Sequence, residues 1–131
     1  MSHHRVEFLL KCVRFDNFID REERKKTDKL AAIRDVWDMF VPQLRKFYIP
    51  GTDLAVDEQL LGYRGHIPGK TYMPSKPRKY GLKKFWICEA RTGFALNVII
   101  YCGRSGDIPH KGLAHDIVVK LIEPFRNSGE I

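Results

Sequence analysis

An aspartate inside an apolar stretch is the first residue of this sequence that could do chemistry. Asp57 lies in the segment Leu54–Leu60, whose alternation predicts a β-strand with Asp57 on the face of Ala55 and Gln59. Mg²⁺ requires oxygen ligands, and two-metal phosphoryl transfer uses carboxylates of this kind to hold both ions. A solvent-facing aspartate on an edge strand gives the same pattern and is the commoner case. The pattern alone therefore leaves both interpretations open.

A dense set of cations between residues 64 and 84 forms the second candidate site. The cations are Arg64, Lys70, Lys76, Arg78, Lys79, Lys83 and Lys84, with Tyr63, Tyr72 and Tyr80 interleaved. Lysine and arginine neutralise phosphates, and tyrosine rings stack on unpaired bases. These residue types predict contact with DNA, and the alternative is a solvated loop with structural tyrosines.

The segment Gly65–Thr71 resembles a phosphate-binding loop but departs from it in two ways. Three residues separate its glycines where the motif needs four. Pro68 offers no N–H to a phosphate, and the prolines that follow prevent the helix that the motif requires. We therefore expect no nucleotide cofactor.

A zinc site has weak support. Its candidate ligands are Cys88, Cys102, His110 and His115. Their spacing matches no common zinc finger, and both cysteines fall in predicted core strands. Buried free thiols are the better interpretation.

The elements that must position these residues divide into a helical first part and a strand-rich second part. Apolar spacing predicts a helix from Met1 to about Phe15, a polar connection over Asp16–Lys26, and a longer helix from Asp28 to Phe47. Pro42 lies inside the longer helix, where we expect a kink or a break. Trp37 and Trp86 are predicted to be core residues.

Three strands and a helix are predicted in the second part. The strands are Leu54–Leu60, Leu82–Glu89 and Phe94–Cys102, and the helix is Leu113–Phe125. Long loops are expected over Gly62–Lys79, Gly103–Lys111 and Asn127–Gly129. The order predicts an α/β (α+β) fold that corresponds to the opening half of a ribonuclease-H-like fold. We expect a helical segment over residues 1–50 and a partial, incomplete ribonuclease-H-like domain over residues 51–131.

Composition fits this picture. The 131 residues are 44% hydrophobic and 30% charged, the balance of a globular protein. The net charge of +7 favours a polyanionic partner such as nucleic acid. There is no apolar run of about 18 residues, so we expect no membrane partner. Three widely spaced cysteines without a secretion signal indicate an intracellular, reducing compartment.

Six short blocks follow one another in a fixed order with short gaps. They are Lys26–Leu30, Ile33–Trp37, Tyr48–Gly51, Val56–Leu60, Tyr63–Gly65 and Tyr72–Lys83. No single block is decisive, but the ordered set is highly specific. It resembles the catalytic domain of piggyBac transposases and of host proteins derived from them, and it extends over about residues 1 to 104.

The resemblance implies that Asp57 is the first of three aspartates that bind two Mg²⁺ ions. The second aspartate of the family lies in a Cys-Asp-Asn-Trp-Phe type segment that this sequence lacks, and the third lies further on. Asp107 and Asp116 stand in the wrong context to replace the second. We therefore expect a partial catalytic domain that does not cleave DNA by itself.

Two functions follow as expectations. The first is a fragment of a DDD-type cut-and-paste DNA transposase, for which the resemblance implies binding to transposon ends, a homodimer in the intact form and a nuclear location. The second is a non-catalytic DNA-binding or interaction module of a domesticated transposase. Either function would use the cations Arg64, Lys70, Lys76, Arg78, Lys79 and Lys83 to bind DNA.

Overall fold

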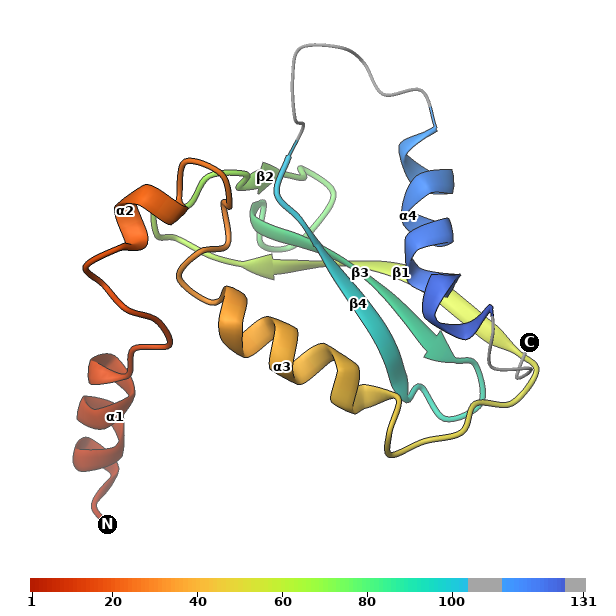
Figure 1. Cartoon of the computed structure of the whole chain (residues 1–131), viewed down its shortest axis with the longest axis horizontal. Helices are drawn as coiled ribbons and strands as arrows, with labels where there is room; N and C mark the ends of the chain where they lie inside the picture. The colour runs from red at the N-terminus through yellow and green to blue at the C-terminus, as the bar shows by residue number, and fades with distance from the viewer. Residues whose placement is uncertain (104–111, 127–131) are drawn as a thin grey trace. The chain divides into compact units, whose positions relative to one another are not determined.

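The computed structural model describes residues 1–103 and 112–126 (Figure 1). The chain divides into two units, Met1–Met39 and Phe40–Ile131. The helices are α1 (His3–Cys12), α2 (Arg21–Arg24), α3 (Arg34–Leu44) and α4 (Leu113–Ile122), followed by the 3₁₀ turn η1 (Glu123–Phe125). The strands are β1 (Leu54–Gly62), β2 (Thr71–Tyr72), β3 (Tyr80–Glu89) and β4 (Ala95–Tyr101). The loops predicted at 104–111 and 127–129 lie outside the described residues.

The first unit contains the predicted N-terminal helix, shortened at both ends. Ser2 caps α1, and its side-chain oxygen accepts a hydrogen bond from the backbone N–H of Arg5. No residue of α1 is buried within the described structure.

The polar segment after α1 is more ordered than its composition predicts. Most residues of the predicted solvated connection over Asp16–Lys26 are exposed, but Arg21–Arg24 is helical and the Asp16 side chain has no exposed surface. Asp16 accepts hydrogen bonds from the guanidinium groups of Arg21 and Arg24, and the pairing with Arg21, with a smaller part from Arg24, lowers the pKa of the Asp16 carboxyl. Opposite charges five and eight positions apart meet here because the chain turns, which charge counting cannot detect.

The longer helix begins later than predicted. Residues Thr27–Ile33 are a series of turns, and Asp28 binds both the backbone N–H of Leu30, at 2.9 Å, and the guanidinium of Arg34, at 2.7 Å. These bonds lower the pKa of the Asp28 carboxyl, with the Arg34 hydrogen bond as the largest cause. Asp28 thus stabilises a turn that precedes α3, and it is not the first residue of the helix.

Pro42 does not break α3, so the predicted break is wrong. The proline lies within the helix, two residues before its end at Leu44. Its missing N–H removes one hydrogen bond, that to the carbonyl of Asp38, but only two residues of the helix follow the proline.

The second unit is built on a four-stranded antiparallel sheet with β3 at its centre. β1 pairs with β3 from Leu54↔Glu89 to Gly62↔Gly81, and β4 pairs with the opposite edge of β3. The two-residue strand β2 also pairs with β3, through Thr71↔Gly81 and Tyr72↔Tyr80. The three predicted strands are therefore confirmed, and β2 is an addition inside the segment predicted as loop.

Helix α4 covers one face of this sheet (Figure 1). The buried cluster consists of Ile87, Leu96, Ile117, Leu121 and Phe125. The buried amide of Asn97 donates from Nδ2 to the carbonyl of Leu121 at 3.0 Å and accepts from the N–H of Val98, so its polar atoms are satisfied. Because α4 lies on the Ile87 face, residues on the alternate face, including Asp57 opposite Trp86, point away from it.

A buried carboxylate at the end of β3 forms hydrogen bonds with residues near the start of the second unit. Glu89 is 6% exposed and accepts hydrogen bonds from the hydroxyls of Tyr48 and Thr92 and from the backbone N–H of Gly51. The Tyr48 ring stacks on Phe94 with 4.5 Å between the ring centroids. These bonds to the ionised form lower the pKa of Glu89 below its ordinary value of 4.5, with Thr92 the largest cause and Tyr48 the second.

The lowered pKa of Glu89 implies that acid destabilises the fold. A group with a lowered folded-state pKa stabilises the fold above its unfolded value, near pH 4.5, and loses that contribution as the pH falls through the folded value. Glu89→Gln should therefore lower the denaturation midpoint at neutral pH, with a smaller difference from wild type at pH 3. Urea denaturation from pH 3 to 7 tests this. A difference that is the same at every pH would contradict the assigned role.

Candidate functional site

Asp57 lies near the middle of β1, on the sheet face that α4 leaves uncovered. Its cross-strand partner is Trp86, and the next pair on the same face is Gln59 and Lys84. Asp57 is exposed, and its Oδ1 accepts a hydrogen bond from the backbone N–H of Glu58 at 2.7 Å. The carboxylate is therefore accessible on a rigid strand.

The neighbours of Asp57 form a mixed aromatic and cationic surface. Trp86 donates from Nε1 to Gln59 at 3.2 Å, and the Lys84 ammonium lies 4.8 Å from the centre of the Trp86 ring. Burial lowers the pKa of Lys84, while burial and then the charge of Asp57 raise the pKa of the Cys88 thiol. Trp86 was predicted as a core residue, but the structure places it half-buried on this surface.

Asp57 fits the role of one metal ligand but does not form a site by itself. Its carboxylate is accessible and supplies the hard oxygen atoms that Mg²⁺ prefers. The adjacent Glu58 points to the other face, where its carboxylate lies 2.5 Å from the ammonium of Lys83. No second carboxylate therefore joins Asp57 from the described part of β1.

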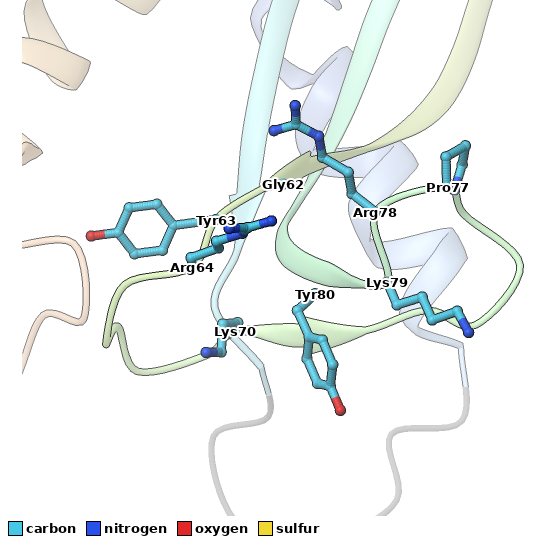
Figure 2. A pocket seen from close by; sticks show the side chains of 8 residues that line it. All are labelled: Gly62, Tyr63, Arg64, Lys70, Pro77, Arg78, Lys79 and Tyr80. Carbon is cyan, nitrogen blue, oxygen red and sulfur yellow. The ribbon is translucent and has the colours of Figure 1, made fainter.

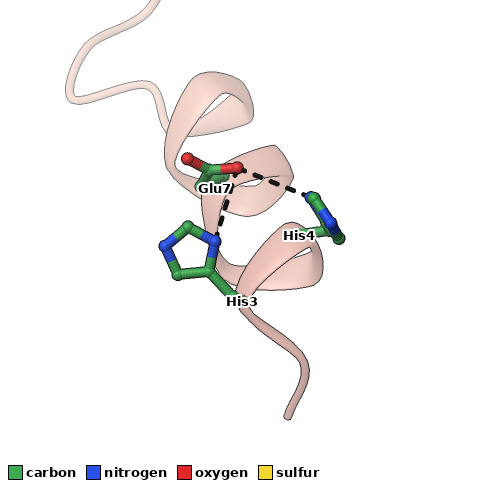
Figure 3. A group of neighbouring side chains, drawn as sticks. All are labelled: His3, His4 and Glu7. Carbon is green, nitrogen blue, oxygen red and sulfur yellow. Dashed lines mark ion pairs between the residues drawn. The ribbon is translucent and has the colours of Figure 1, made fainter.

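One group of metal-ligand type does occur in the described residues. His3, His4 and Glu7 lie on α1 with Glu7 Oε2 at 3.7 and 3.8 Å from the two Nδ1 atoms (Figure 3). All three residues are exposed, and they belong to the other unit from Asp57.

The predicted cationic loop folds into a pocket beyond the end of β1. The cavity has a volume of about 540 Å³ and is lined by Gly62, Tyr63, Arg64, Lys70, Pro77, Arg78, Lys79 and Tyr80 (Figure 2). Four of these residues are cations, and none is acidic. Residues that are sixteen positions apart in the sequence meet because Met73 and Lys79 close a hairpin-like loop, with a hydrogen bond of 2.8 Å from the Met73 N–H to the Lys79 carbonyl. We call this cavity the basic pocket.

Two glycines give the basic pocket its shape. A Cβ at Gly62 would lie 2.2 Å from Cδ of Arg78, so only glycine lets the Arg78 side chain cross the end of β1. A Cβ at Gly65 would lie 2.4 Å from the hydroxyl oxygen of Tyr63, whose ring occupies that space. The sequence gives no signal for these contacts, since glycine in a polar loop usually indicates only a turn.

The predicted DNA-binding cations separate into two groups. Arg64, Lys70, Arg78 and Lys79 line the basic pocket, while Lys76 lies half-buried in the turn beyond it. Lys83 lies on the α4 face, paired with Glu58 and 4.8 Å above the ring of Phe85. The alternation of β3 places Lys83 and Lys84 on opposite faces of the sheet, as the predicted strand over Leu82–Glu89 implies.

The thiols and the helices add two further observations. Cys88 and Cys102 are half-buried, Cys12 is exposed, and none of the three forms a disulfide; His110 lies outside the described residues. Within residues 1–103 and 112–126, no helix combines the length and apolar character needed to span a bilayer.

Comparison with known proteins gives two findings. A family model described as "Transposase IS4" matches residues 1–131. A cryo-EM structure of a piggyBac transposase synaptic complex with hairpin DNA matches with a TM-score of 0.87 and 37% sequence identity. The match covers 97% of this chain and 27% of the solved chain, so this chain spans about a quarter of that protein. The agreement confirms the mixed α/β, ribonuclease-H-like fold predicted from the order of elements.

Proposed function

Because this chain belongs to a transposase family, that of the piggyBac transposase and of the model described as Transposase IS4, we propose that it forms part of a metal-dependent DNA transposase domain. The observation that carries the proposal is the position of Asp57. An accessible carboxylate lies near the middle of the first strand of a ribonuclease-H-like sheet, on the face not covered by α4.

Asp57 would supply one ligand to the divalent ions of the transposase active site. Bound Mg²⁺ would activate the attacking oxygen and stabilise the leaving oxygen of a phosphodiester. Among the described strands β1 pairs only with β3, so its other edge is available to a further strand that carries another carboxylate. Since one carboxylate is too few for two ions, these 131 residues alone are expected to bind DNA without cleaving it.

The basic pocket would hold the phosphates of the DNA. Its four cations and lack of acidic lining residues make it a site for a polyanion, and the charge of +7 supports association over a longer range. DNA as the partner is further supported by the hairpin DNA in the solved piggyBac complex.

Binding and cleavage by the 131-residue chain test this function together. Fluorescence anisotropy with a short DNA duplex should show an affinity that falls linearly on a log–log plot as salt rises from about 50 to 200 mM. Supercoiled plasmid with Mg²⁺ should stay uncut. Nicking that needs Mg²⁺ and disappears in Asp57→Ala would refute the proposed inactivity, and an absence of DNA binding at low salt would refute the proposed partner.

A second candidate, a non-catalytic DNA-binding module, is favoured by one observation. The basic pocket is formed entirely by residues 62–80, whereas the metal site needs a second carboxylate beside Asp57 that the described part of β1 does not supply. Under this function Asp57→Asn leaves DNA affinity unchanged with and without Mg²⁺. A Mg²⁺-dependent gain in affinity that the variant loses would favour the catalytic function.

Two further properties belong to the proposal. A protein that acts on chromosomal DNA would be located in the nucleus, and a fluorescent fusion of the chain can show this. A homodimer would place two pockets on one DNA molecule, and analytical ultracentrifugation with and without DNA measures that state.

A further inference from the structure

Two tyrosines at the edge of the basic pocket carry an inference that rests on the proposed DNA binding and extends it. Tyr72 of β2 and Tyr80 of β3 are direct cross-strand partners, with 4.8 Å between their ring centroids and 40° between their planes. Aromatic pairs of this kind stabilise strand pairing, and β2 has only two residues. The pair is therefore held in place by the sheet itself.

The rings are nevertheless accessible. Tyr72 is 52% exposed and Tyr80 is 58% exposed. Tyr63, the other tyrosine of the pocket, is 43% exposed, and its ring occupies the space above Gly65. The Tyr72–Tyr80 pair thus presents aromatic surface that the protein's own packing does not use.

Two cations of the basic pocket are close to Tyr80. The Lys70 ammonium lies 5.8 Å from the centre of the Tyr80 ring, and Lys79 directly precedes Tyr80 at the wall of the pocket (Figure 2). The Lys70 ammonium also donates to the carbonyl of Gly65 at 3.4 Å, which holds it near the pocket. Phosphate-binding groups and aromatic faces therefore occupy one site, the combination found where proteins bind single-stranded nucleic acid.

We propose that Tyr72 and Tyr80 form a stacking platform for an unpaired base, whose flanking phosphates lie in the basic pocket. A cavity of about 540 Å³ is in the size range of small-ligand pockets, large enough for a nucleotide and too small for a duplex. Bases inside a duplex are covered on both faces by their neighbours, so only an unpaired base has a face to offer the ring. The partner is therefore DNA with unpaired nucleotides, such as a flap, a gap or the loop of a hairpin.

Anisotropy with single-stranded DNA and with a duplex of the same sequence, at one salt concentration, tests the platform. Tyr80→Ala should weaken binding to the single strand by roughly 5- to 100-fold, the range seen when one stacking ring is removed, and should change duplex binding less than about twofold. Tyr80→Phe keeps the ring and should bind both like wild type. The Tyr80→Ala change should reduce the affinity for a single strand with one abasic position less than it reduces the affinity for the intact single strand.

Equal weakening of single-strand and duplex binding by Tyr80→Ala would overturn the platform, because the ring would then act only through the shape of the pocket. Weakening of both by Tyr80→Phe to the same extent would assign the effect to the hydroxyl. Binding of neither DNA form by the wild type is the separate result that removes the proposed function itself.

A measurement on the wild-type chain covers the case in which Tyr80→Ala does not fold. Single-stranded DNA that carries 2-aminopurine should lose fluorescence on binding, because the probe base stacks on a ring, and Tyr72→Leu should retain more of that fluorescence. A wild-type complex with undiminished fluorescence at every probe position would overturn the proposal.

Discussion

Changing Asp57 to asparagine is expected to abolish DNA cleavage by a transposase that carries this chain as part of its catalytic domain. The amide keeps the size and the hydrogen bond from Glu58 N–H but removes the negative charge that a divalent ion requires. We expect a loss of at least about 100-fold, as found when one group that stabilises transition-state charge is removed. Nicking and strand transfer by a chimera, in which this chain replaces the matching quarter of the solved piggyBac transposase, measure the loss.

Glu58→Gln is the matched control in the same chimera. It makes the same chemical change at the adjacent position, on the opposite face of β1, where Glu58 pairs with Lys83. Cleavage should survive in this variant. In the absence of Mg²⁺, DNA affinity of the Asp57→Asn chimera should stay within about threefold of wild type, since the carboxylate would bind metal ions and not phosphate. Retained cleavage by the Asp57→Asn chimera would remove Asp57 from the active site.

The strands and α4 could be predicted because their signals are local. Period-two alternation in Leu54–Leu60 and helical spacing in Leu113–Phe125 reflect which side chains face the core. The buried cluster that contains Ile87 and Leu121 is this core. Asp57 could be selected only with the family resemblance, because the chemical meaning of one aspartate on a strand depends on residues far from it in the sequence.

The interactions that could not be predicted join residues across turns. The Asp16 side chain has no exposed surface because two arginines of the short helix α2 contact it. Asp28 stabilises a turn, and α3 begins only after that turn, at Arg34. Both segments have the polar composition of a solvated surface. In the basic pocket, Gly62 and Arg78 meet over the end of β1, and no spacing rule connects the two positions.

Removing three cations of the basic pocket should weaken DNA binding strongly and change its salt dependence. Each phosphate contact contributes about 0.9 to the log–log salt slope for duplex DNA, and about 0.7 for single strands. If Arg64, Arg78 and Lys79 each contact one phosphate, their replacement by glutamine should reduce the slope by about 2 to 3. At about 50 mM salt this corresponds to a loss on the order of 10³-fold in affinity.

A second triple variant with the same change in net charge separates the pocket from general charge. Arg5, Lys11 and Lys120 are exposed and lie outside the pocket lining. Replacing them with glutamine lowers the net charge by the same three units, from +7 to +4. If DNA binds through the pocket, this variant keeps most of the salt slope of wild type, because none of the three replaced cations lines the pocket. Equal losses in the two variants would mean that the chain attracts DNA through its total charge, and the basic pocket would then have no specific part in binding.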